Sequence, residues 1–172
     1  SIGTFRSIAL RSSLLRTDKE ITEIYHRQID TVYRICYSFM KNKPEAEDMV
    51  QETFLRLIAS GKTFENQRHE KAWLIVTASN LCKDQLKRLY RTDEDLDDHA
   101  ELAGDRGPEA NPVLEAIFRL PPDYKTAVYL YYYEGYTTRE IAGLLHCPQP
   151  TVRTRLARAR KQLKTMLGGD LE

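Results

Sequence analysis

The residues best placed to do chemistry are the basic side chains between Pro148 and Lys164. This stretch contains no acidic residue, and arginine or lysine recurs along it at short intervals. Such side chains bind phosphate oxygens, and an arginine can also donate two hydrogen bonds to the edge of a guanine. The chemistry that this stretch predicts is recognition of a nucleic acid.

An apolar stripe predicts how the basic side chains are oriented. At about 100° per residue, apolar residues spaced i, i+4, i+7 and i+11 share one side of a helix. This stripe consists of Val152, Leu156, Ala159 and Leu163. Small or basic residues occupy the opposite side, and further basic residues line the flanks, as major-groove binding requires. These outward residues are Arg153, Thr154, Arg155, Ala157, Arg158, Arg160, Lys161 and Lys164.

A shorter helix is predicted directly before the basic one. Thr137 and Glu140 have the spacing of a capping box, and Ile141 begins a run of apolar residues at helical spacing. The sequence His146-Cys147-Pro148 then interrupts the pattern. Two helices joined by so tight a turn form a helix-turn-helix, so residues 136–167 are predicted to bind duplex DNA.

A second face with nucleic-acid chemistry is predicted on a helix over residues 72–90, which follows a polar loop over 62–71. Apolar residues such as Leu74 and Ala78 share one side. The other side presents an aromatic ring, an amide and several charges, which could stack on an unpaired base or hold its backbone. These residues are Trp73, Asn80, Lys83, Asp84, Lys87 and Arg88. Packing at the helix start is the favoured role of Trp73, and Asp84 is expected to orient Arg88.

A helix over residues 45–60 has the cleanest amphipathic pattern of the chain, and Gly61 is predicted to end it. Its apolar stripe is Ala46, Met49, Val50, Thr53, Phe54 and Leu57. The opposite side carries Asp48, Gln51, Glu52 and Leu55. A leucine among acidic residues suits docking to another protein, although a plain solvated face is an equally good interpretation of this pattern.

The order of periodic segments and breaks predicts an all-α chain of two small helical domains joined by a flexible acidic linker. Residues 93–109 hold eight acids against one base, too polar a composition for a packed core. The predicted parts are an N-terminal arm or artificial remnant (1–17), a first domain (18–91), the linker (92–111), a second domain (112–168) and a tail (169–172). In the second domain, Asp123 is predicted to cap a tyrosine-rich helix.

Composition excludes several other classes of protein. The net charge is only +1, so the overall charge of the chain indicates no particular partner. The acidic and basic residues lie in separate stretches, which suggests separate surfaces. The three cysteines are far apart, which disfavours a structural zinc site and a disulfide framework and favours a reducing cytoplasm. No apolar run is long enough to insert into a membrane. Glu23 and His26 match half of a di-iron motif, but no second pair exists, so neither a metal nor another cofactor is expected.

The three segments in this order resemble the extracytoplasmic-function (ECF) sigma factors, a group of the sigma-70 family of RNA polymerase specificity subunits. PEAEDMVQETFLRL resembles the polymerase-binding helix of sigma region 2. FENQRHEKAWLIVTASNLCKDQLKR resembles its promoter-melting segment, and LPPDYKTAVYLYYYEGYTTREIAGLLHCPQPTVRTRLARARKQL resembles sigma region 4. The resemblance covers residues 21–167, and the three motifs around an acidic linker are together far more specific than any one of them.

This resemblance implies a transcription initiation factor, and not an enzyme, that binds core RNA polymerase and promoter DNA. An anti-sigma factor that covers both domains is also implied. The residues implied for polymerase binding are Asp48, Gln51, Glu52 and Leu55. Those implied for the −10 element are Asn66, Trp73, Asn80, Lys83, Lys87 and Arg88, with residues 66–69 as a base-capturing loop. Those implied for the −35 element are Gln149, Thr151, Arg153, Thr154, Arg155, Arg158 and Lys161.

One departure from the family pattern concerns the start of the recognition helix. Pro148 and Pro150 stand where the family has a capping serine and a small residue, so the helix is expected to start near Pro150. This leaves the contacts of Gln149 open. The alternative function is an autonomous helix-turn-helix regulator, which would leave the two faces of the first domain without a role.

Overall fold

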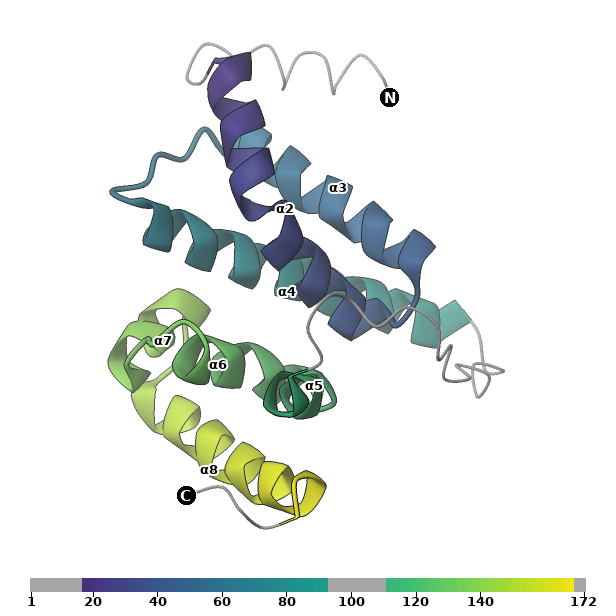
Figure 1. Ribbon diagram of the computed structural model, residues 1–172, viewed down its shortest axis with the longest axis vertical. Coiled ribbons are helices and arrows are strands. Elements are labelled where there is room, and N and C mark those ends of the chain that lie inside the picture. The colour runs from purple at the N-terminus through teal and green to yellow at the C-terminus, as the bar shows by residue number, and fades with distance from the viewer. Residues whose placement is uncertain (1–16, 93–110, 169–172) are drawn as a thin grey trace. The chain divides into compact units, whose positions relative to one another are not determined.

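The computed structural model describes residues 17–92 and 111–168, which form seven α-helices and, within these ranges, no strand (Figure 1). The helices belong to two compact units, with three helices in the first and four in the second. The predicted all-α fold is therefore confirmed. The predicted arm before Thr17, nearly all of the predicted linker and the predicted tail lie outside the described residues.

The first unit begins with α2, Asp18–Met40, whose start is fixed by a capping box that the sequence analysis overlooked. The backbone N–H of Glu20 donates to Thr17 Oγ1 (3.2 Å), and the Thr17 N–H donates to Glu20 Oε2 (3.0 Å). The helix ends at Met40, and Lys41 after it takes the left-handed conformation with φ 63°. Two otherwise unpaired N–H groups are thereby satisfied at the start of the helix.

Helix α3, Lys43–Ser60, follows after two residues, Lys41 and Asn42. The N–H of Glu45 donates to Asn42 Oδ1 (2.9 Å), and Pro44 occupies the first turn, where its missing N–H has no cost. Gly61 ends the helix with φ 60°, as predicted. The six buried residues of α3 are those of the predicted stripe: Ala46, Met49, Val50, Thr53, Phe54 and Leu57.

Helix α4, Gln67–Thr92, starts five residues before its predicted start at Ala72. Asn66 Oδ1 accepts the His69 N–H (2.9 Å), so residues 67–69 form the first helical turn and the loop predicted over 66–69 is wrong. The first turn of α4 is polar and lacks the apolar periodicity that predicts a helix, so its start was placed too late. Its polarity reflects a buried ion pair, because the Glu70 side chain points inward and binds α2.

The buried Glu70 of α4 is held by hydrogen bonds from two side chains of α2. Arg27 donates through Nε to Glu70 Oε1 (3.0 Å) and through Nη2 to Oε2 (3.1 Å), and Gln28 Nε2 also donates to Oε1 (3.0 Å). Both carboxylate oxygens of this buried glutamate are thus paired, as a charge removed from water requires. The interaction fixes the start of α4 against α2.

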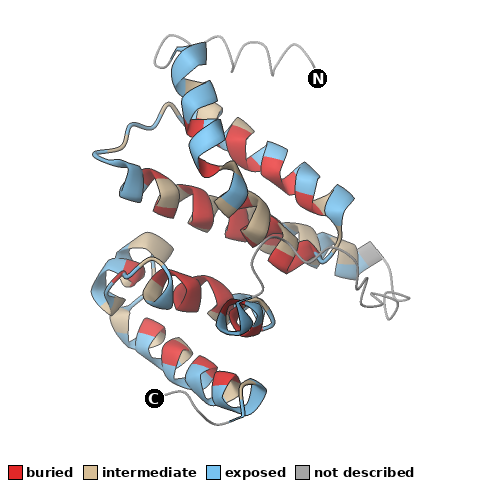
Figure 2. Cartoon of the chain, in the orientation of Figure 1, coloured by how far each residue is buried: buried red, intermediate tan, exposed pale blue. Residues whose placement is uncertain are grey.

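All three helices of the first unit pack against one another. Figure 2 shows their buried residues on the facing sides. Val32 of α2, Leu57 of α3 and Ile75 of α4 are fully buried, and each removes an apolar side chain from water at about 1.5–3 kcal/mol. This shared core leaves the outer faces of α3 and α4 available to partners.

The second unit contains α5 (Pro112–Phe118), α6 (Pro122–Tyr132), α7 (Thr138–Leu145) and α8 (Gln149–Met166). Asn111 caps α5 by accepting the Val113 N–H (3.0 Å). The predicted cap at Asp123 is wrong, because α6 is preceded by Pro121 without a side-chain cap and Asp123 lies in its first turn. Helix α8 packs against α5, α6 and α7, so its position depends on the whole unit.

Aromatic rings stabilise the second unit on the side of α5 and α6. Tyr129 stacks on both Phe118 and Tyr133, with ring centroids 5.9 and 5.2 Å apart. Tyr132 accepts a hydrogen bond from Arg160 Nε of α8 (3.0 Å). This hydrogen bond raises the pKa of Arg160, and it ties one basic flank of α8 to α6.

No helix among the described residues combines the length and the apolarity that a bilayer span requires.

The capping box of α7 gives a first testable prediction. Thr137 Oγ1 accepts the Glu140 N–H (3.1 Å), and Glu140 Oε1 accepts the Thr137 N–H (3.1 Å). Thr137→Ala should lower the free energy of unfolding of the second unit by about 1 kcal/mol, whereas Thr137→Ser should retain it. Urea unfolding followed by circular dichroism measures the change.

The two units can be distinguished in that experiment because the sole tryptophan, Trp73, belongs to the first unit. Its fluorescence transition should not move in Thr137→Ala. Equal unfolding midpoints for the alanine and serine variants would contradict a stabilising role for this cap.

Candidate nucleic-acid interfaces and docking face

The outward face of α8 is formed as the sequence predicts. Its buried residues are the four of the predicted stripe, Val152, Leu156, Ala159 and Leu163. The predicted contact residues Arg153, Thr154, Arg158 and Lys161 are exposed, and Thr151 and Arg155 are half-buried at its sides. Arg153, Arg155 and Arg158 form no ion pair with any described residue, so their charges are available to an anion.

The turn between α7 and α8 is a tight one. His146 adopts the left-handed conformation (φ 52°), and the Cys147 N–H donates to the Ala142 carbonyl (3.1 Å). Helix α8 then begins at Gln149, one residue before the expected start at Pro150. Pro150 is accommodated because it lies in the first turn, where the helix needs no N–H from it.

Gln149 has a structural contact that the sequence analysis left open. Its Nε2 donates to Thr138 Oγ1 of α7 (2.9 Å), which joins the first turns of the two helices. The Gln149 side chain is half-buried there. Its amide therefore positions α8 relative to α7, while its second N–H and its oxygen remain available for further hydrogen bonds.

A hollow of about 390 Å³ lies beside the recognition face, and the two α6 residues that line it were not anticipated as site residues. Asp123 and Tyr124 of α6 line it together with Thr154, Arg155 and Arg158 of α8. Asp123 was expected to cap α6 instead. The spacing within α8 alone gives no indication of what α6 places next to it.

On the first unit, the predicted −10 residues occupy one long side of α4. Asn80, Lys87 and Arg88 are exposed, whereas Trp73 and Lys83 are half-buried. Trp73 packs on Phe64 with ring centroids 5.9 Å apart, which agrees with the favoured packing role. Asn66 lies before α4, exposed, with its side-chain oxygen engaged as the helix cap.

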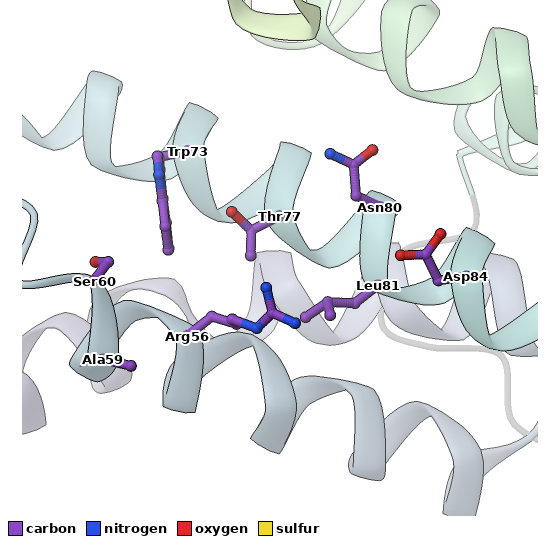
Figure 3. A pocket seen from close by; sticks show the side chains of 8 residues that line it. All are labelled: Arg56, Ala59, Ser60, Trp73, Thr77, Asn80, Leu81 and Asp84. Atoms are coloured by element: carbon purple, nitrogen blue, oxygen red, sulfur yellow. The ribbon is translucent and has the colours of Figure 1, made fainter. Parts of the chain in front are cut away.

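A hollow of about 440 Å³ lies between α3 and α4 (Figure 3). Two of its residues, Trp73 and Asn80, belong to the predicted −10 set. Arg56 was missed, although it follows Leu55 directly, because the amphipathic pattern of α3 identifies only the buried stripe and the side opposite to it. The full lining is Arg56, Ala59 and Ser60 of α3 with Trp73, Thr77, Asn80, Leu81 and Asp84 of α4.

Asp84 does not make the contact expected of it. It forms no ion pair with Arg88 or with any other described residue, and it lines the hollow instead. The expectation that Asp84 orients Arg88 is therefore wrong. Helical spacing permits an i, i+4 pair, but such a pair at an exposed position gains only about 0.2–0.5 kcal/mol.

The predicted docking face lies on α3, opposite its buried stripe. Asp48, Gln51 and Glu52 are exposed, and Leu55 is half-buried at the same side of the helix. An apolar side chain bordered by two carboxylates thus remains accessible. Such a combination of one apolar anchor and a polar rim is typical of a protein interface.

Comparison with known proteins accounts for both units. Residues 24–92 match the family described as Sigma-70 region 2, and residues 110–163 match the family described as Sigma-70, region 4. The chain is 32% identical to the ECF RNA polymerase sigma factor SigW of Bacillus subtilis, over 86% of this chain and 87% of that protein. It is also 32% identical to the ECF sigma factor SigE of Mycolicibacterium smegmatis, over 84% of this chain and 60% of that protein.

A solved structure shares the fold. The sigma factor RpoE of Bartonella quintana, determined in complex with the anti-sigma factor NepR, superposes with a TM-score of 0.67 at 24% identity, covering 89% of this chain and 99% of that one. The family matches occur in the order that the sequence motifs predict. This chain belongs to the ECF sigma factors of the sigma-70 family.

Proposed function

We propose a residue-level account of how this chain, a promoter-specificity factor that binds core RNA polymerase, recognises its promoters. The observation that carries the proposal is the division of α8 into a fully buried apolar stripe and an exposed basic side without any acid. Such a helix can enter a major groove with its back held by α6 and α7. The second unit then binds the −35 element as duplex DNA.

Within this interface, Arg153, Thr154 and Arg158 contact base edges or the sugars next to them. A bidentate arginine contact with guanine discriminates against other bases by about 1–3 kcal/mol. Thr151, Arg155 and Lys161 lie nearer the phosphates, which fix register without reading sequence. Gln149 contributes chiefly by positioning α8 through Thr138, a role that the hydrogen bond between their side chains supports.

The first unit binds the −10 element as its strands separate. Asn80 presents an amide that can bind a base edge, while Lys83, Lys87 and Arg88 hold the backbone of the strand. Trp73 supports this face through its packing on Phe64. Asn66 contributes by fixing the first turn of α4, and any base captured nearby would meet the short loop over residues 62–66.

Core RNA polymerase docks on the α3 face that is formed by Asp48, Gln51, Glu52 and Leu55. Asp48, Gln51 and Glu52 are exposed and Leu55 is half-buried on the side of α3 opposite its buried stripe, which supports this assignment. The buried stripe keeps the helix in place, so docking requires no rearrangement of the unit. Leu55 supplies the apolar contact, and the acidic residues meet basic groups of the polymerase.

The functional parts follow the predicted boundaries: residues 18–91 for polymerase and −10 binding, 92–111 as the acidic linker, and 112–168 for −35 binding. Two modest affinities joined by a linker give a combined affinity higher than either alone. The acidic residues of the linker suit passage through a basic channel of the polymerase. The chain itself catalyses no reaction, because RNA synthesis belongs to the core enzyme.

Regulation by an anti-sigma factor is part of the proposal. The related fold of the Bartonella quintana factor was determined with such a partner bound, and this supports a similar partner here. A partner that covers α3 and α8 at once would block polymerase and promoter together. The site of action is the cytoplasm, where core polymerase and promoter DNA are found.

Transcription in a purified system tests the function. Core polymerase with this chain should initiate at promoters that core polymerase alone ignores, and the chain alone should bind duplex promoter DNA weakly. Strong, sequence-specific binding by the chain alone, together with no effect on core polymerase, would favour the autonomous regulator.

A further inference from the structure

One acidic side chain lies beside the basic face of α8. The sequence between Pro148 and Lys164 contains no acid, yet the fold places Asp123 of α6 in the hollow next to that face. The rest of the lining is Tyr124 of α6 with Pro150, Thr151, Thr154, Arg155 and Arg158 of α8. A carboxylate thus stands at a surface whose other charged groups attract phosphate.

The charges that line this hollow do not neutralise one another. Asp123 is exposed, and it forms no ion pair with any described residue. Arg155 and Arg158 form none either. The negative charge of Asp123 therefore acts on any anion that the two arginines attract.

The position of Asp123 in α6 offers a purely local role as the alternative. Helix α6 begins after Pro121 without a side-chain cap, and Asp123 lies in its first turn. A carboxylate there interacts favourably with the positive end of the helix dipole. If this were its whole role, loss of the charge would destabilise the second unit slightly and would not strengthen its binding of DNA.

Docking of α8 in a major groove places phosphates along both sides of the helix. Helix α6 packs against α8, and its first turn forms one wall of the hollow, so Asp123 lies on the side where one strand passes. Duplex DNA carries one negative charge per about 1.7 Å of its axis. The carboxylate meets these like charges in every sequence, because phosphates carry no sequence information.

We propose that Asp123 limits the affinity of the second unit for duplex DNA by repelling the phosphates next to α8. The inference rests on the proposed function of the second unit, and it adds a residue that opposes binding. The second unit alone then holds bulk DNA weakly, and stable binding requires the first unit as well. This matters because a genome offers a vast excess of non-specific sites, on which a tighter second unit would be retained.

Binding of the full chain to labelled duplexes, followed by fluorescence anisotropy, tests the inference. One duplex carries a −35 element selected by transcription, and the other carries a scrambled sequence of the same length. Asp123→Asn should tighten binding to both by the same factor, about threefold to tenfold at low salt, because repulsion between exposed charges is modest. The gain should shrink as salt is added. Asp123→Glu keeps the charge and should bind as the wild type does.

Glu115→Gln is the matched control. It removes one negative charge from the same unit, at an exposed position on α5 that does not line the hollow. Because salt screens exposed charges over about 10 Å, this change should alter the affinity by less than about twofold. A gain as large as that of Asp123→Asn would show that only the net charge of the unit matters, and it would overturn the role of Asp123.

The sign of the effect separates repulsion from a structural role. Urea unfolding should show that Asp123→Asn is no more stable than the wild type, so tighter binding cannot come from a firmer fold. Weaker or unchanged binding by this variant would overturn the inference. A gain confined to one sequence, or an altered preference at one −35 position, would also overturn it, because Asp123 would then read a base.

Failure of the proposed function gives a different result. In that case the wild-type chain with core polymerase shows no base preference within the −35 element, whatever the affinity of the variants. If that preference exists and Asp123→Asn brings no gain in affinity, only the repulsive role of Asp123 is wrong.

Discussion

Leu55→Glu should prevent the chain from co-eluting with core RNA polymerase while its first unit stays folded. Leu55 is half-buried on the outer side of α3 and contributes nothing to the core stripe, so the fold tolerates the change. A carboxylate at an apolar anchor must be desolvated on docking, and the loss of such an anchor costs at least about 2 kcal/mol, or roughly thirtyfold in affinity. Size-exclusion chromatography of the mixture measures the loss.

Thr63→Glu is the matched control, because it adds the same charge at an exposed loop position next to α3 but outside the docking face. This variant should co-elute normally. The fluorescence of Trp73 reports the folding of the first unit in both variants. Co-elution of Leu55→Glu at wild-type levels would place the polymerase-binding surface elsewhere.

Arg158→Ala should weaken initiation about 5- to 150-fold at promoters with the preferred −35 element and relax the base preference at one −35 position. Arg158 is exposed on α8, has no ion-pair partner among the described residues, and lines the hollow next to Asp123. Its removal therefore leaves the stability of the unit nearly unchanged. Single-round transcription from −35 variants measures the effect.

Arg119→Ala controls for the loss of one positive charge, because Arg119 is exposed at the end of α5 and lies outside α8. It should reduce initiation slightly and at all promoters alike. If Arg158→Ala behaves in the same way, Arg158 contacts phosphate and does not read sequence.

Much of the fold could be predicted because each helix of this chain carries its own signals. The stripes of α3 and α8 match the predicted residues without exception, since an amphipathic helix that packs on one side must bury its periodic apolar residues. Gly61 ends α3 as predicted. The capping box at Thr137 fixed the start of α7 in the same way.

The errors occur where a residue depends on a partner that is distant in sequence. The start of α4 looked like a loop because Glu70 is polar, and only the approach of Arg27 and Gln28 explains its burial. Asp84 was assigned to the nearest cation on its own helix, whereas the structure places it in a hollow shared with α3. Helical periodicity shows which residues share a face but not what lies opposite that face.

In the candidate sites, too, the features of single helices could be predicted, whereas the contacts between helices could not. The outward faces of α3, α4 and α8 follow from the sequence, and none of their predicted site residues is fully buried. The residues that join two helices were missed, namely Arg56 between α3 and α4 and Asp123 beside α8. The hydrogen bond between Gln149 and Thr138 could not be predicted either, because Pro148 and Pro150 made the start of α8 uncertain in the sequence.

The central claim is that the two units read two separate promoter elements through α4 and α8. The most direct test is transcription by core polymerase with wild-type chain, Asn80→Ala or Arg158→Ala from a library of single-base promoter variants. Asn80→Ala should alter base preference only at −10 positions, and Arg158→Ala only at −35 positions. A change at both elements in either variant, or at neither, would contradict the assignment of one element to each unit.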